Sequence, residues 1–129
     1  MNEKIKKIIL IEDDPAIADI YETIMKGSHF NVETINCGQD AIKRIKDLAE
    51  EQEKPDIILL DLVLPDINGI DVFKEIKSNE KTKDIKVFIF TNQQDSQLEW
   101  PEGIKPDKFL IKADTTPSNL MEIIKQELK

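Results

Sequence analysis

Three short, continuous runs of apolar residues constrain the fold of this chain more than any other feature. They lie within residues 7–11, 56–60 and 86–90, and each is only four residues long. Such runs are typical of strands in a parallel sheet, where both faces of each strand are buried. Two weaker strand candidates lie in residues 29–37 and 107–112. The sequence therefore predicts a sheet of five parallel strands.

Helical periodicity separates the strand candidates. In the first helical segment Asp14 is placed to cap the helix, Pro15 occupies its first position and Gly27 is expected to end it. Thr116 and Pro117 begin the last helix in the same way. The predicted apolar stripes of the four helices are Ile17, Ile20, Tyr21 and Ile24; Ala41, Ile42, Ile45, Leu48 and Ala49; Ile70, Phe73 and Ile76; and Leu120, Ile123, Ile124 and Leu128.

The alternation of strands and helices predicts an α/β fold. We expect a flavodoxin-like, doubly wound sheet with strand order 2-1-3-4-5 and helices on both faces. Residues 92–106 are the unclear connection, since they offer at most one or two helical turns before Pro101 forbids continuation. A crossover must still lie there because parallel strands require one. We therefore expect a short or irregular fourth helix.

Length and charge limit the class of protein. The 129 residues are expected to form a single domain, 1–129. No apolar run approaches the roughly 18 residues of a membrane helix, and no signal region precedes the first strand, so we expect no membrane insertion. The single Cys37 fits a reducing compartment and is expected to have no further role, which favours a cytoplasmic protein. The formal net charge of −8 argues against sequence-independent binding to nucleic acid or anionic membranes.

Acidic residues directly follow two of the predicted strands. Glu12 and Asp13 follow the first strand, and Asp61 follows the third. In the order 2-1-3-4-5 these strands are neighbours at the switch point, where sites of open α/β sheets form outside the carboxyl ends. Clustered carboxylates repel one another, and a hard divalent cation relieves this repulsion by bridging their oxygen atoms. The three acids therefore predict a Mg²⁺ site.

Two further polar residues end strands at the same edge. Thr91 ends the fourth strand and offers a hydroxyl, and Lys112 follows the fifth strand and offers a fixed cation. An acid nucleophile, a metal, a hydroxyl donor and an ammonium are the groups that stabilise charge on a transferring phosphoryl group. Each residue alone has an ordinary structural explanation. Their joint placement at one edge favours a phosphoryl site.

Over essentially its whole length the chain resembles a response-regulator receiver domain of two-component signalling. The motifs that carry the resemblance are LIEDDP, PDIILLDLVLPDINGIDV, VFIFTN and KFLIKA, in the order and approximate spacing of the family. The resemblance implies that Asp61 accepts the phosphoryl group and also belongs to the metal site. It implies that Asp13 binds Mg²⁺ directly, that Glu12 reaches the metal through water, and that the backbone carbonyl of Val63 is a further ligand.

The resemblance also implies a switch. Thr91 and Lys112 would contact the phosphoryl oxygens, and Thr91 would move inward after phosphorylation of Asp61, leaving space for the ring of Phe109 to rotate. Phe90 is expected to be core, because alternation along the strand points it elsewhere. The phosphoryl donor would be a phosphohistidine of a sensor histidine kinase or a phosphotransfer protein. The changed surface would lie on the fourth helix, the fifth strand and the fifth helix.

No output domain is expected, so the signal would pass to an unknown downstream protein. The chain would not be an enzyme in the usual sense, although it would assist its own phosphorylation and autodephosphorylation. Pro65 and Gly69 fit the turn after the phosphoacceptor, where Pro fixes φ and Gly relieves backbone strain. Asp14 is interpreted as a helix cap and Asp66 as a loop residue.

Three positions depart from the family pattern. Asn92 stands beside the phosphoryl site where the family usually has Ala or Gly. Ala113 replaces the Pro that usually follows the Lys, and so removes a cis peptide bond that helps to aim Lys112. Trp100 lies in the shortened fourth helix, where we expect it to pack, with an exposed partner anchor as the alternative.

Other functions are less well supported. Phosphate relay by His29, the only histidine, is disfavoured because it lies in a loop and not on a helix of a bundle. An FMN binder of the same fold would need a loop rich in Gly, Ser or Thr after the first strand. A haloacid-dehalogenase-type phosphatase would need an acid where Val63 stands. The remaining alternative is a receiver-like module that binds proteins without phosphorylation.

Overall fold

A computed structural model of the protein describes residues 4–93, 100–101 and 103–129. Within these residues the chain forms one sheet of five parallel strands in the order β2-β1-β3-β4-β5. The predicted fold class and strand order are therefore confirmed. The strands are β1 (Lys7–Ile11), β2 (Asn31–Ile35), β3 (Ile57–Leu60), β4 (Lys86–Thr91) and β5 (Lys108–Ile111).

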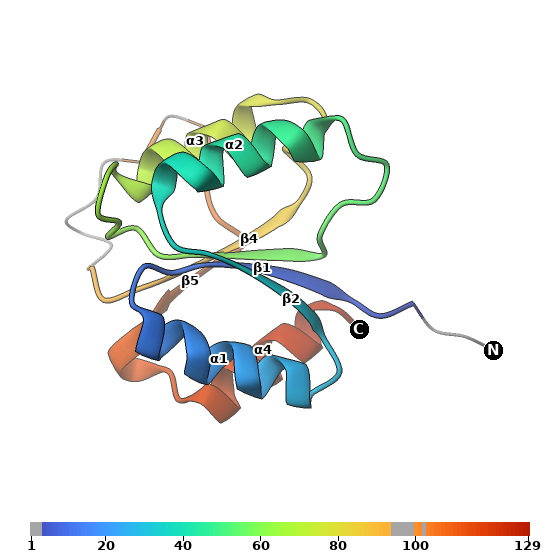
Figure 1. The fold of residues 1–129 in the computed structure, drawn as a ribbon, viewed down its shortest axis with the longest axis vertical. Coiled ribbons are helices and arrows are strands. Elements are labelled where there is room, and N and C mark those ends of the chain that lie inside the picture. Colours follow the sequence, from blue (N-terminus) through green and yellow to red (C-terminus); the bar gives the residue numbers. More distant parts are fainter. Residues whose placement is uncertain (1–3, 94–99, 102) are drawn as a thin grey trace.

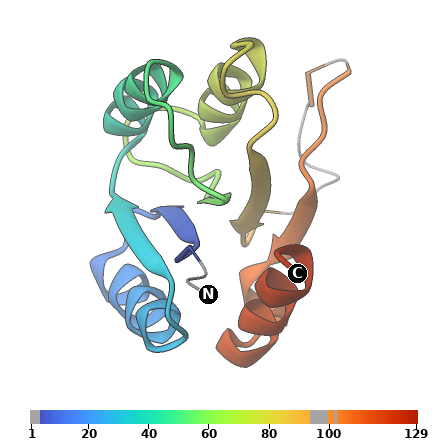
Figure 2. The same cartoon turned by 90° about the vertical axis from the view of Figure 1, so that its right-hand side faces the viewer.

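Helices cover both faces of the sheet. On one face lie α2 (Gly38–Ala49) and α3 (Gly69–Ser78), and on the other lie α1 (Pro15–Gly27) and α4 (Pro117–Glu127). The layers are seen from two directions in Figure 1 and Figure 2. The label α4 belongs here to the C-terminal helix, which is the fifth helix of the sequence prediction.

Alternation along the strands divides the core into two halves. In β1, Ile9 and Ile11 pack into the half beneath α2 and α3, whereas Ile8 and Leu10 pack into the half beneath α1 and α4. All four side chains are at most 2% exposed. Because both faces of the central strands are buried, their sequences are unbroken apolar runs.

The helix ends largely follow the predicted signals. The Asp14 carboxylate accepts hydrogen bonds from the backbone amides of Ala16 at 2.9 Å and Ile17 at 3.3 Å, and Pro15 is the first residue of α1. The Thr116 hydroxyl caps α4 in the same manner. Gly27 is the last residue of α1, but the residue in the left-handed region is His29, with a φ of 69°.

One detail of the helix predictions is wrong. Ile20 is 51% exposed, and Ala18 and Met25 are instead the buried residues of α1. Consecutive residues of an α-helix are rotated by about 100° around its axis, so Ile20 lies outside the core-facing side of α1 that contains Tyr21.

The short fourth helix was predicted in the connection from β4 to β5. Most of the segment in which that helix was predicted, residues 94–99 and 102, lies outside the described residues. Trp100 is described, and it packs against the core half beneath α3, as the packing interpretation predicted. No helix in the described part of the chain is long and apolar enough to cross a membrane.

Candidate functional site

The acidic residues after β1 and β3 meet at the carboxyl edge of the sheet. Parallel pairing places Ile11 opposite Leu60, so the residues that follow each strand emerge side by side. The amide of Asp61 donates to the carbonyl of Ile11 at 3.0 Å, which fixes the start of the loop after β3. Carboxylate oxygens of Glu12, Asp13 and Asp61 all lie within 4.8 Å of one another. The predicted acidic cluster is therefore present in the structure.

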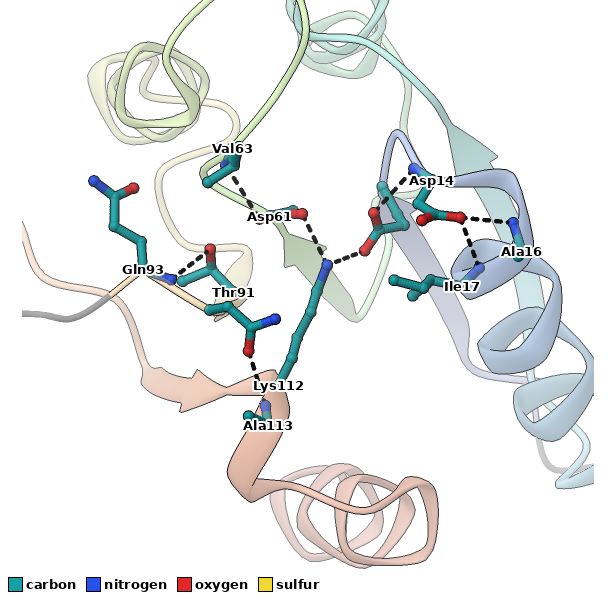
Figure 3. A network of polar contacts seen from close by, with 11 residues as sticks. Asp14, Ala16, Ile17, Asp61, Val63, Thr91, Gln93, Lys112 and Ala113 are labelled. Carbon is teal, nitrogen blue, oxygen red and sulfur yellow. Dashed lines mark hydrogen bonds and ion pairs between the residues drawn. The ribbon is translucent and has the colours of Figure 1, made fainter.

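Lys112 reaches into this cluster from the end of β5. Its Nζ lies 2.8 Å from Oδ2 of Asp61 and also donates a hydrogen bond to Oε1 of Glu12. Figure 3 shows the extended side chain of Lys112 pointing at Asp61. The ammonium thus balances two carboxylates that are only 2% and 6% exposed. Without a counter-charge this pair of buried acids would be strongly unfavourable.

The charges in the cluster are coupled. Burial raises the pKa of Glu12, although the hydrogen bond from Lys112 offsets part of this effect. Burial alone would lower the pKa of Lys112, but the hydrogen bonds to Asp61 and Glu12 outweigh it and raise that pKa. Lys112 therefore stays protonated at neutral pH.

The donor set fits a hard divalent cation. The three side chains offer only oxygen ligands, which are the atoms that Mg²⁺ prefers, and they come from two neighbouring loops at one edge. Val63 lies in the same loop as Asp61, and its amide donates to Oδ1 of Asp61 at 3.1 Å. A role of the Val63 carbonyl as a ligand stays a prediction.

Thr91 is the last residue of β4 and is completely buried. Its hydroxyl oxygen accepts a hydrogen bond from the amide of Gln93 at 3.3 Å, as Figure 3 shows. This bond is local to the end of β4 and does not join Thr91 to the acids. The proposed contact between Thr91 and a phosphoryl group stays a prediction.

Phe109 lies in an aromatic row between β5 and α3. The ring of Phe109 meets that of Trp100 edge to face at 5.9 Å, and Trp100 meets Phe73 of α3 at 5.5 Å. Phe109 is half-buried, whereas Phe90 is 2% exposed and packs edge to face on Tyr21 in the other half of the core. The prediction that Phe90 is core is confirmed.

Asp66 has a structural role that the sequence interpretation missed. Its two carboxylate oxygens accept hydrogen bonds from the amides of Gly38 at 2.7 Å and Gln39 at 2.8 Å. Asp66 thereby caps α2 from a loop 28 residues away, while Cys37 at the cap position of α2 makes no capping bond. These hydrogen bonds lower the pKa of Asp66. Nothing in the local sequence of α2 indicates so distant a cap.

Gly69 is required by close packing and not by its φ. Among the described glycines only Gly103 has a positive φ, so the prediction that Gly69 relieves strain in the turn is wrong. A Cβ on Gly69 would lie 2.4 Å from Cα of Leu62 and 2.8 Å from the carbonyl oxygen of Asp61. The first turn of α3 therefore rests directly on the backbone of the loop that follows β3.

The histidine and the cysteine lie elsewhere in the fold. His29 is exposed in the turn between α1 and β2, and Cys37 is a partly buried free thiol at the start of α2. Neither belongs to the acidic cluster.

Comparison with known proteins identifies the family. The model of the response regulator receiver domain matches residues 8–125. The DNA-binding response regulator MtrA of Mycolicibacterium smegmatis is 27% identical over 124 residues, which are 96% of this chain and 51% of that protein. The chain thus spans about half the length of this curated relative.

Two solved structures extend the comparison. The phosphorylated cyanobacterial phytochrome response regulator RcpA is 26% identical, with a TM-score of 0.77 over 95% of this chain and 91% of that one. The Mn²⁺-bound form of response regulator Rcp1 is 25% identical, with a TM-score of 0.76 over 95% and 91% of the two chains. The fold, the acidic edge and the family match agree, and the chain belongs to the response regulator receiver domains of two-component systems.

Proposed function

We propose that this protein is a phosphorylation-dependent signalling switch in which Asp61 accepts a phosphoryl group. The donor in this proposal is a phosphohistidine of a sensor histidine kinase or of a phosphotransfer protein. The observation that carries it is the convergence of three carboxylates and one ammonium at the ends of β1, β3 and β5. The phosphorylated state of the 26% identical RcpA supports it.

In the proposed reaction an oxygen atom of the Asp61 carboxylate attacks the phosphorus atom. The phosphorus–nitrogen bond of the phosphohistidine breaks, and its electron pair returns to the imidazole nitrogen. The product is an acyl phosphate on Asp61, which water later hydrolyses. Lys112, which already lies against Asp61, would then contact a phosphoryl oxygen and stabilise its charge.

The proposed cofactor is Mg²⁺. Asp13 and Asp61 would bind it directly, Glu12 through water, and Val63 through its backbone carbonyl. When bound, the ion neutralises charge on the phosphoryl oxygens. The oxygen-rich cluster supports this assignment, as does the Mn²⁺-bound form of the 25% identical Rcp1.

The proposed output is a change of shape near β5. A phosphoryl group on Asp61 would draw the Thr91 hydroxyl inward and let Phe109 move, which is a two-state change driven by a local charge. Phe109 contacts Trp100, so its movement would alter the surroundings of the only tryptophan. A downstream protein would then bind the surface formed by β5, the C-terminal helix α4 and the connection from β4 to β5. A single receiver domain without an output domain in residues 1–129 is part of this proposal.

Beryllofluoride, a mimic of a bound phosphoryl group, tests the proposal without a kinase. With Mg²⁺ present, it is expected to change the fluorescence of Trp100 and the amide NMR signals around Asp61. Asp61→Asn should abolish both responses. Thr91→Ala should keep the NMR response near Asp61 but reduce the fluorescence response, because the hydroxyl that carries the change is gone. A wild-type protein with no response would favour the alternative, a module that binds proteins without phosphorylation.

A further inference from the structure

Two departures from the family pattern lie against each other in the structure. The side-chain Oδ1 of Asn92 accepts a hydrogen bond from the backbone amide of Ala113 at 2.9 Å, across 21 residues of sequence. Figure 3 shows this bond beside the base of the Lys112 side chain. The bond needs both residue types: Ala113 keeps an amide hydrogen that a proline would lack, and Asn92 has a carbonyl that Ala or Gly would lack.

The bond holds the backbone that follows Lys112 in the sequence. Before Lys112, Ile111 is paired with Thr91 in the sheet. After it, residues Lys112–Asp114 form a single 3-10 turn, whose first amides have no partner within the turn itself. The Asn92 side chain supplies that partner for Ala113. The backbone of Lys112 is therefore tied to the end of β4 on both sides.

The position of that backbone decides where the ammonium lies. Lys112 has a long side chain, and it must stay extended to reach both Glu12 and Asp61. A small rotation of the turn would carry Nζ away from the acids, because the side chain has little spare length. Asn92 directly follows Thr91, whose hydroxyl is the proposed switch group. The bond between Asn92 and Ala113 therefore also connects the end of β4 to the turn that begins at Lys112.

We propose that Asn92 is a positioning residue for Lys112, acting through its bond to the Ala113 amide. The expected effect of Asn92 on the rate of phosphorylation rests on the proposed function of Asp61. Its expected effect on the position of Lys112 does not depend on phosphorylation. Asn92 touches no reacting atom. Its role is to keep the ammonium of Lys112 between the two carboxylates and to make the ends of β4 and β5 move together.

The first test measures the structure of the unmodified protein. In Asn92→Ala, the Ala113 amide should exchange its hydrogen faster, and Lys112 should react faster with a small amine-reactive reagent, quantified by peptide mass spectrometry. The matched control is Asn79→Ala, since the Asn79 side chain makes the same kind of bond to the amide of Lys81 at 2.8 Å, in the loop after α3. It should leave both measurements at Ala113 and Lys112 unchanged.

The second test measures phosphorylation by a small phosphodonor at saturating Mg²⁺. Asn92→Ala should slow the reaction by roughly threefold to tenfold, the scale expected for loss of one hydrogen bond, and the control Asn79→Ala should leave the rate unchanged. An unchanged rate in Asn92→Ala would overturn the kinetic part of the proposal.

The two tests separate failure of the inference from failure of the proposed function. A wild-type protein that takes up no phosphoryl group would refute the function of Asp61, and the labelling of Lys112 would still decide the role of Asn92. Unchanged labelling of Lys112 in Asn92→Ala would refute the positioning role, whatever the phosphorylation result.

Discussion

Replacing Gly69 with alanine should distort the loop that follows β3 and lower the stability of the whole domain. The added Cβ would lie 2.4 Å from Cα of Leu62, whereas carbon atoms pack best at about 3.5–4.0 Å. The obstructing atoms are backbone, so no side chain can rotate away, and α3 or the loop must shift by more than about 1 Å. Overpacking of this kind costs about 1–3 kcal/mol. The displaced atoms directly adjoin Asp61, so Mg²⁺ affinity should fall as well.

Urea unfolding followed by circular dichroism measures this effect. With a slope of about 2 kcal/mol per M, the midpoint for Gly69→Ala should fall by roughly 0.5–1.5 M. Gly27→Ala is the matched control: a Cβ at Gly27 meets nothing within 4 Å, and its φ is not positive. That variant should be unchanged or gain up to about 1 kcal/mol. Equal midpoints for Gly69→Ala and the wild type would refute the close-packing argument.

Three further substitutions test the charges and the core. Lys112→Met leaves two buried carboxylates without a cation, so without metal the free energy of unfolding should fall by about 3–5 kcal/mol. Mg²⁺ should raise the melting temperature of this variant more than that of the wild type, and an equal rise would contradict the argument. Hydrogen bonds from Arg44 lower the pKa of Glu33 despite partial burial, so its stabilising contribution is present above the ordinary carboxyl pKa and is lost as the pH falls through the lowered value. The difference in urea midpoint between wild type and Glu33→Gln should therefore shrink from about pH 7 to about pH 3, and a constant difference would refute the assignment. Phe88→Ala empties a completely buried position and should cost about 3–5 kcal/mol in the same assay, whereas a cost below about 1 kcal/mol would contradict its core role.

Much of the fold could be predicted because burial on both faces leaves a clear pattern. The runs at residues 8–11 and 57–60 are apolar at every position, since successive side chains fill opposite halves of the core. Capping signals were equally direct at Asp14 and Thr116, where the capping side chain lies next to the amides it binds. The edge of the buried face of α1 was harder to predict, because Ile20 is apolar yet lies outside that face.

The site was predictable only where residues follow strands. Glu12, Asp61 and Lys112 each follow a strand, and parallel pairing brings strand ends to one edge. Asp66 and Gly69 act across the fold, one by capping a distant helix and the other by letting α3 rest on the loop backbone. Such contacts depend on tertiary distances that sequence spacing does not encode. The bond between Asn92 and Ala113 belongs to the same class, because neither residue alone indicates the other.

The most direct test of the central claim is the intact mass of the protein after incubation with Mg²⁺ and a small phosphodonor. Wild-type protein should gain the mass of one phosphoryl group, and the gain should disappear without Mg²⁺ and in Asp61→Asn. Asp66→Asn is a useful comparison, since its carboxylate lies in the same loop but binds amides of α2, and it should still gain the group. An unchanged wild-type mass, or a gain that persists in Asp61→Asn, would contradict the assignment of Asp61 as the phosphoacceptor.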